Sequence, residues 1–134
     1  MTSRSSLRVV TAALIAAAMG GGAWVPASRA YAAEPTSFSR SVFPIFKDNC
    51  ISCHQSGGAG HETSGLDLTT YQGVMKGTKF GPMVIPRDPD GSNLMWLLDW
   101  RAAPQLRMPH GAKQLSTSDR NAIRNWIREG AMDN

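Results

Sequence analysis

Two cysteines and a histidine stand close together in the chain, as Cys50-Ile51-Ser52-Cys53-His54. Two thiols three positions apart on a helical turn can each reach one vinyl group on the same edge of a porphyrin, and the histidine that follows can turn its imidazole onto the iron. This C-x-x-C-H spacing is the signature of covalent c-type haem attachment. Cys50, Cys53 and His54 are therefore the candidate residues for binding one haem c, with His54 as an axial ligand of its iron.

Three other interpretations of these residues are open. A C-x-x-C pair also occurs in thioredoxin-like dithiols, but that motif needs a βαβ setting, and no valine- and isoleucine-rich strand precedes Cys50. A structural zinc site needs four ligands, and beyond the motif only His61 and His110 remain to complete it. A disulfide between Cys50 and Cys53 would be strained and would close too small a loop to stabilise the fold much.

The first 32 residues have the three parts of a secretory signal peptide, namely a basic start, an apolar run over residues 9–19 and a small-residue exit. Residues 30–32 read Ala-Tyr-Ala, which is the A-x-A pattern of a cleavage site. The apolar run is shorter than the roughly 20 residues that a membrane-spanning helix requires. We therefore expect residues 1–32 to be removed, and residues 33–134 to form one exported, periplasmic domain without a membrane span.

The charge of the chain gives no support to a nucleic-acid partner. The formal net charge is +4 over 134 residues. Arg4, Arg8 and Arg29 lie in the expected signal peptide, and without them the charge falls to about +1. A remaining domain of about 100 residues has room for one hydrophobic core, to which a haem would add a large apolar plate.

An amphipathic helix is predicted directly before the cysteines. Its apolar residues recur at helical spacing and are Phe38, Val42, Phe43, Ile45 and Phe46. Pro44 lies inside this pattern, so the helix proper is expected to begin only about a turn earlier, where a proline is tolerated. Residues 55–65 contain four glycines and read as an irregular loop. A short helix is expected over residues 70–76.

Two more helices are predicted in the second half of the chain. One begins after Ser92 as its N-cap, and its Trp96 and the nearby Trp100 are expected to pack in the core or over the haem edge. The last helix has Ser116 as its N-cap and Asp119 at the capping-box position. Its apolar stripe is Ala122, Ile123, Trp126 and Ile127. With little strand signal elsewhere, these patterns predict an all-α fold of short helices.

The haem iron needs a second axial ligand, and the residues leave several candidates open. The expected mature chain has methionines at 75, 83, 95, 108 and 132, and histidines at 61 and 110. Met95 fits an apolar helix pattern typical of core packing. Met132 is close to the last residue and is expected to fray. Met108 lies in a loop, directly before a proline, from which its thioether can approach a flat iron face end-on.

The chain resembles the class I c-type cytochromes, and within them the small planctomycete-type cytochrome c domains. The segments that carry the resemblance are 38–46, the C-x-x-C-H motif, 65–68, 84–86, 92–94, Met108-Pro109 and 126–131. The resemblance implies an all-α, cytochrome c-like fold around one covalent haem, with thioethers at Cys50 and Cys53 and iron ligation by His54 and Met108. His110 stands where the family has a second proline, so it is the first rival of Met108 as the distal ligand.

An electron carrier, and not an enzyme, is what this resemblance implies. His/Met ligation raises the reduction potential and leaves no open position on the iron for a substrate. The partners would be a donor and an acceptor redox protein, each docking transiently. The alternative is a haem-based sensor or ligand-binding module, in which the distal ligand is labile or different. No G-x-S-x-G or H-E-x-x-H pattern suggests other chemistry.

Overall fold

Short helices make up the regular structure of the computed structural model, which describes residues 34–134. In chain order they are η1 (Phe38–Val42), α1 (Phe43–Asn49), α2 (Ala59–Ser64), α3 (Tyr71–Lys76), α4 (Asn93–Leu98), η2 (Pro104–Leu106) and α5 (Thr117–Arg128). Residues 34–134 contain no β-strand, only an isolated bridge between Thr78 and Gly81. The predicted all-α fold is confirmed, whereas the expected signal peptide lies outside the described residues.

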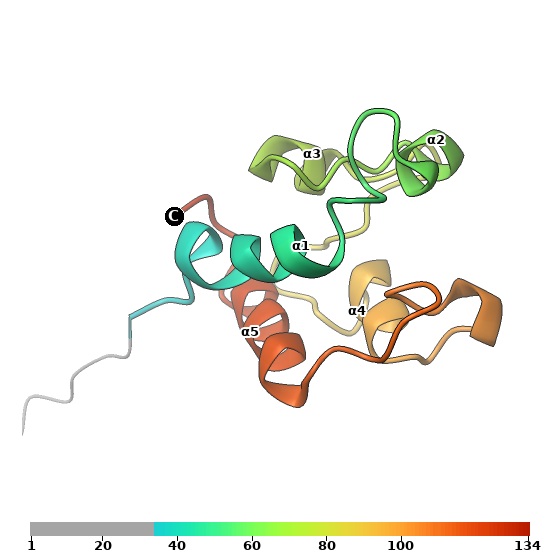
Figure 1. Cartoon of the computed structure of the whole chain (residues 1–134). Coiled ribbons are helices and arrows are strands. Elements are labelled where there is room, and N and C mark those ends of the chain that lie inside the picture. The colour runs from blue at the N-terminus through green and yellow to red at the C-terminus, as the bar shows by residue number, and fades with distance from the viewer. Residues whose placement is uncertain (1–33) are drawn as a thin grey trace, which may run out of the picture. The chain divides into compact units, whose positions relative to one another are not determined.

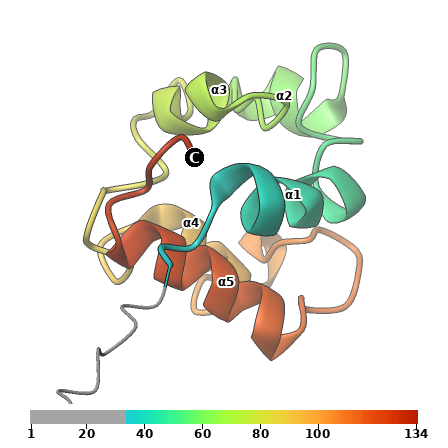
Figure 2. The same cartoon turned by 90° about the vertical axis from the view of Figure 1, so that its left-hand side faces the viewer.

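Helix α1 lies between two groups of elements (Figure 1). Helices α2 and α3 lie on one side of α1, and α4 and α5 lie on the other, as the turned view also shows (Figure 2). The chain leaves α1 through the cysteine motif and enters the α2 side, whereas Met108 belongs to the segment that joins α4 to α5. The two parts of the candidate site are therefore carried by different groups of helices.

Pro44 determines how the first helix is built. It occupies the first turn of α1, where the missing N–H needs no partner. The preceding turn, η1, is a π-helix in which the Phe43 N–H donates to the Phe38 carbonyl. This wider turn makes room for a proline ring that would clash with the carbonyl four residues earlier in a regular α-helix. A helical turn thus precedes Pro44, as predicted, but it is π-helical.

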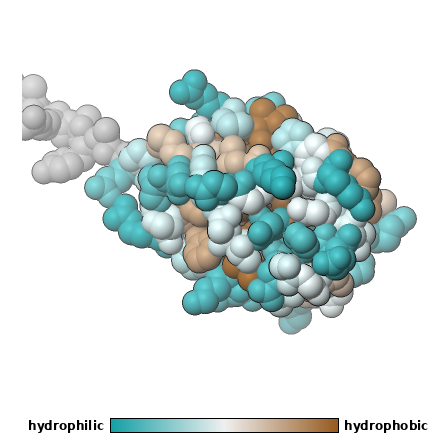
Figure 3. Space-filling model, turned by 90° about the horizontal axis from the view of Figure 1, so that it is seen from above, coloured by the Kyte–Doolittle hydropathy of each residue, from teal (hydrophilic) through white to brown (hydrophobic). Residues whose placement is uncertain are grey.

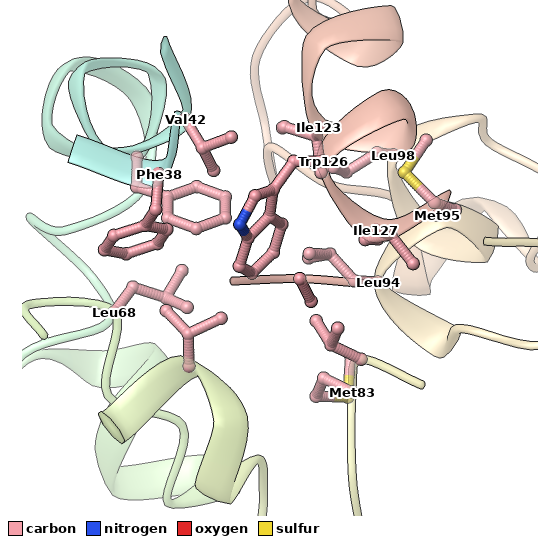
Figure 4. Close-up of a cluster of buried hydrophobic side chains, with 14 of the residues drawn as sticks. Phe38, Val42, Leu68, Met83, Leu94, Met95, Leu98, Ile123, Trp126 and Ile127 are labelled. Atoms are coloured by element: carbon pink, nitrogen blue, oxygen red, sulfur yellow. The ribbon is translucent and has the colours of Figure 1, made fainter. Parts of the chain in front are cut away.

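The packing of η1 on α5 forms the centre of the hydrophobic core (Figure 4). Phe38 and Trp126 are almost completely buried, and their ring centroids are 5.3 Å apart. The Tyr71 ring meets Phe38 edge-on at 5.3 Å, and the Tyr71 hydroxyl donates to the Ala131 carbonyl at 2.8 Å. The side chain of Asn134 closes the same region, because its Oδ1 accepts from the Phe38 N–H at 2.8 Å. Residues from both ends of the described range therefore hold the first helix.

Helix α5 agrees with its prediction. The Ser116 hydroxyl accepts from the Asp119 backbone N–H at 3.1 Å, so Ser116 is the N-cap. The Asp119 carboxylate in turn accepts from the Ser116 hydroxyl at 2.6 Å. In a full capping box it would accept from the Ser116 backbone N–H instead. The predicted stripe is the buried face, with Ile123, Trp126 and Ile127 fully covered.

The prediction of an irregular loop over residues 55–65 is wrong in part, because residues Ala59–Ser64 form α2. The glycines that suggested a loop include the two that bound this helix. Gly58 is the N-cap, and Gly65 ends the helix in the left-handed conformation at φ 76°. The short length of α2 and its lack of a capping side chain explain why the residue pattern did not reveal it.

Helix α4 has Ser92 as its N-cap residue, as predicted, but the Ser92 side chain makes no capping hydrogen bond. Its hydroxyl donates to the Asp88 carbonyl at 2.7 Å and accepts from the Ile85 N–H at 2.8 Å, so it braces the preceding loop. Trp96 was expected in the core or over the haem edge; it is 45% exposed and lies outside the core. The buried face of α4 consists of Leu94, Met95 and Leu98. Trp96 lies outside the helical spacing of that face and therefore points away from the core.

Candidate haem site

The cysteine motif continues directly from the end of α1. The Cys50 N–H donates to the carbonyl of the buried Phe46 at 2.8 Å, which closes the helix. The N–H groups of Cys53 and His54 both donate to the Cys50 carbonyl, at 3.1 and 3.0 Å. All three candidate residues for haem attachment therefore lie on one hydrogen-bonded turn that is anchored in the core through Phe46.

Both thiols are free. Cys50 is half-buried against the core and Cys53 is exposed. Burial raises the pKa of the Cys50 thiol to about 11, and the neighbouring Cys53 adds to the rise, so Cys50 is neutral at physiological pH. Within residues 34–134 no three His, Cys, Asp or Glu side chains gather as a metal site. The described residues thus show neither a disulfide nor a cluster of zinc ligands, and without strands they offer no βαβ setting for a thioredoxin-like dithiol.

His54 is packed against the backbone of α2. A methyl group added at Gly60 would lie 2.7 Å from Cε1, 2.9 Å from Nε2 and 3.0 Å from Nδ1 of the His54 ring, so a side chain at position 60 would require the ring or α2 to shift. The His54 carbonyl accepts from the Leu68 N–H at 2.9 Å, which ties the turn to the segment after α2. The His54 ring therefore contacts the α2 backbone, and the His54 main chain is held by the hydrogen bond from Leu68.

The chemistry of His54 fits a metal ligand. Burial lowers the pKa of this histidine, an effect that the nearby Leu66 backbone partly offsets. The imidazole is therefore neutral at physiological pH, which is the form that binds iron. Its Nδ1 is buried and has no hydrogen-bond partner among the described residues. Two free thiols and a neutral imidazole on one turn together form a donor set that suits a covalently held haem.

The backbone of Met108 is attached to the end of α4. Its N–H donates to the Leu97 carbonyl at 3.2 Å, and its carbonyl accepts from the indole N–H of Trp100 at 2.9 Å. The Met108 side chain is half-buried and packs against the core, whereas His110 is exposed. The two candidate distal ligands therefore differ in burial, Met108 being packed against the core and His110 being exposed to solvent.

The remaining methionines differ from Met108 in their burial. Met83 and Met95 are buried in the core, the latter as expected from its helix pattern, and Met132 is 42% exposed. Met75, on α3, is half-buried like Met108 and packs against the same cluster. Met75 is therefore the methionine most similar to Met108 in its surroundings.

Two residues contribute to the site in ways that the sequence did not reveal. Gly60 was one of four glycines in a segment that reads as a loop, and Trp100 was expected only to pack. Their roles depend on contacts with His54 and Met108 that exist only in the folded chain. A glycine inside a helical stretch is the signal that could have drawn attention to position 60, since it weakens a helix unless close packing requires it.

Comparison with known proteins places the site within a family pattern. Residues 50–110 match the family described as Planctomycete cytochrome C. The matched stretch begins at Cys50 and ends just after Met108, so it contains both parts of the candidate site. A search of curated proteins found no match, and neither did a search of solved structures.

Proposed function

We propose that this chain, which contains a small all-α cytochrome c-like domain, is an exported one-electron carrier with one covalently bound haem c. Cys50 and Cys53 would form the thioether bonds, and His54 and Met108 would ligate the iron. The observation that carries the proposal is the C-x-x-C-H turn at the start of the family match, with both thiols free and a half-buried, neutral imidazole beside them.

The bound haem would supply a ferric/ferrous couple, and the residues of this chain would set its properties. The α2 backbone at Gly60 fixes the orientation of the His54 ring. The Met108 side chain is half-buried and packs against the hydrophobic core. An apolar environment disfavours the extra charge of ferric iron and raises the potential. Ligation by both His54 and Met108 would leave the iron no open position for a substrate, which supports a carrier role.

Docking with redox partners is expected to be weak and reversible. The face of the molecule over α2 and α3 is mostly hydrophilic and carries small apolar areas (Figure 3). Transient electron-transfer complexes have small interfaces of mixed character.

Cytochrome c domains of this type are typically exported, in agreement with the expected signal peptide. Among residues 34–134, no helix has the length and apolar character needed to cross a membrane.

The test of haem binding is the mass and the visible spectrum of the chain exported together with a haem-maturation system. We expect a mass increase of one haem that persists in denaturant and disappears in the Cys50→Ala, Cys53→Ala double variant. A zinc protein or a dithiol would lack that increase. A parent chain without covalent haem would therefore overturn the proposal.

The test of the ligand assignment is the weak far-red band that a methionine bound to ferric iron produces. We expect this band in the parent, its loss in Met108→Ala, and its retention in His110→Ala and Met75→Leu. A parent that holds haem but lacks the band, and whose ferrous form binds carbon monoxide rapidly and completely at neutral pH, would instead indicate a sensor or ligand-binding module.

A further inference from the structure

Helix α4 ends in a hydrogen-bonded turn that usually contains glycine. The Trp100 N–H donates to the Leu97 carbonyl at 3.2 Å, and the Arg101 N–H donates to the Trp96 carbonyl at 3.0 Å. These are the two bonds of a Schellman motif, whose left-handed position favours glycine because it has no side chain. Here that position is held by Trp100, at φ 58°. A bulky residue in this conformation indicates that its side chain makes contacts that outweigh the backbone cost.

The contacts of the Trp100 indole lead to Met108. Its Nε1–H donates to the Met108 carbonyl at 2.9 Å, and the Arg107 guanidinium lies over the ring, with Cζ 5.4 Å from the ring centroid. The Met108 N–H donates to the Leu97 carbonyl, which also accepts from the Trp100 N–H. Both polar backbone groups of Met108 are thus fixed to the end of α4, and the carbonyl is fixed by the Trp100 side chain.

We propose that Trp100 is a positioning residue for the distal ligand, which holds the Met108 backbone so that the thioether stays on the iron and small exogenous ligands stay out. The inference rests on the proposed function, because it requires Met108 to be that ligand. Without the indole N–H, the backbone of Met108 itself keeps only its hydrogen bond to the Leu97 carbonyl. By holding Met108 on the iron, Trp100 would favour an electron carrier over a sensor or ligand-binding module in which the distal position is open.

Trp96, on α4 itself, is a matched control for Trp100 in the turn that follows the helix. Its indole N–H donates to the Asp90 carbonyl at 2.9 Å, and the Arg101 guanidinium lies over its ring at 4.5 Å. The two tryptophans therefore make the same kinds of contact, one indole hydrogen bond to a backbone carbonyl and one stacked guanidinium. They differ in that the Trp96 bond does not reach Met108. Replacing either tryptophan by phenylalanine removes one such bond and keeps an aromatic ring.

The experiment compares the haem-loaded parent with Trp100→Phe and Trp96→Phe. Far-ultraviolet circular dichroism reports the helices, the far-red band reports the methionine ligand, and flash photolysis reports carbon monoxide binding to the ferrous protein. For Trp100→Phe we expect parental helix content, a weakened far-red band that is lost at a lower pH than in the parent, and carbon monoxide binding about tenfold faster, the factor that one ordinary hydrogen bond represents. Trp96→Phe should match the parent.

A second variant, Trp100→Gly, keeps the test decisive if Trp100→Phe folds poorly. Glycine suits the left-handed backbone but has no indole, so we expect good folding together with the same weakening of the far-red band. Parental band and binding rate in both Trp100 variants would overturn the inference, as would an equal effect of Trp96→Phe. A parent that itself lacks the band would instead contradict ligation by Met108, so failure of the proposed function is distinguished from failure of this inference.

Discussion

His54 and Met108 lie in different parts of the fold, and different interactions hold them. On the His54 side, the imidazole touches the α2 backbone so closely that a methyl group at Gly60 would require the ring or α2 to shift. On the Met108 side, two hydrogen bonds attach a half-buried backbone to the end of α4. Close packing opposes any change of volume, whereas hydrogen bonds near the surface can open locally. We therefore expect the His54 side to respond to steric changes and the Met108 side to polar ones.

Trp126→Ala should have the largest effect on stability, because the His54 side and the Met108 side both depend on the packing of η1 on α5. Trp126 is 1% exposed, and its truncation would leave a cavity beside Phe38. We expect the free energy of unfolding to fall by about 3–5 kcal/mol. Guanidinium denaturation of the haem-loaded protein measures this. Trp96→Ala, at a position that is 45% exposed, should lose much less, and equal losses would contradict the central place of the η1–α5 packing.

Gly60→Ala tests the steric character of the His54 side. The added methyl group would lie within 3.0 Å of three imidazole atoms, so either α2 or the ring must move. We expect a loss of about 1–3 kcal/mol, the usual cost of overpacking. Chemical denaturation of the haem-loaded protein measures it, with Thr63→Ala on the exposed face of α2 as the control. If Gly60→Ala were as stable as the parent, α2 would not be packed on His54 in the haem-bound protein.

Asp99→Asn tests the polar character of the Met108 side. The Asp99 side chain, 12% exposed, accepts a hydrogen bond from the Arg120 guanidinium at 3.1 Å and pairs with Arg124, which ties the end of α4 to α5. We expect a loss of about 1–2 kcal/mol at low salt, because the arginines are partly solvated, and a smaller loss at high salt.

Denaturation of the Asp99→Asn variant at two ionic strengths measures this effect. Asp90→Asn is the matched control, since Asp90 also pairs with Arg124 but its side chain is 79% exposed. Exposed pairs contribute little to stability, so this control should be close to the parent. A loss in Asp99→Asn that did not change with salt would indicate that shape, and not charge, holds this end of α4.

Thr69→Val should have the smallest effect, and it concerns the segment behind His54. The Thr69 hydroxyl and N–H both donate to the Asp67 carboxylate and lower the pKa of Asp67 below its ordinary value of 3.8. A lowered pKa contributes stability at neutral pH that is lost as the pH falls through the folded-state value. Without the hydroxyl, the pKa of Asp67 should rise, and acid unfolding should begin at a slightly higher pH.

Acid titration monitored by NMR at the Asp67 carboxyl measures the effect of Thr69→Val. Thr69→Ser keeps the hydroxyl and should retain most of the lowered pKa. An unchanged Asp67 titration in Thr69→Val would show that the backbone N–H alone is responsible.

The sequence predicted what short-range patterns determine. Local features of this kind are the C-x-x-C-H spacing, the apolar residues before it and the Ser116-capped last helix. The structure has helices η1 and α1 before the motif and helix α5 after Ser116. Helix α2 was missed because a six-residue helix bounded by glycines lacks both a capping side chain and an apolar stripe. The outward direction of Trp96 was missed because α4 is too short to define its buried face from residue types alone.

The interactions that hold the ligands could not be predicted, for a different physical reason. Gly60 matters because it has no side chain, which lets the His54 ring lie against position 60. This contact exists only in the folded chain. The role of Trp100 depends on a left-handed backbone and on the return of the chain eight residues later to bring the Met108 carbonyl to its indole. Such contacts follow from the path of the loops, which local patterns do not encode.

In a chain exported as proposed, the contact of η1 with α5 would also set an order of events. A chain delivered from its N-terminal end would present the Cys50–His54 turn long before the residues around Trp126 arrive to cover Phe38. Until then the half-burial that raises the pKa of Cys50 would not be established, and both thiols would be open to an attachment enzyme. Haem would thus be joined to an unfinished chain, and the arrival of α5 would close the domain around a group already bound.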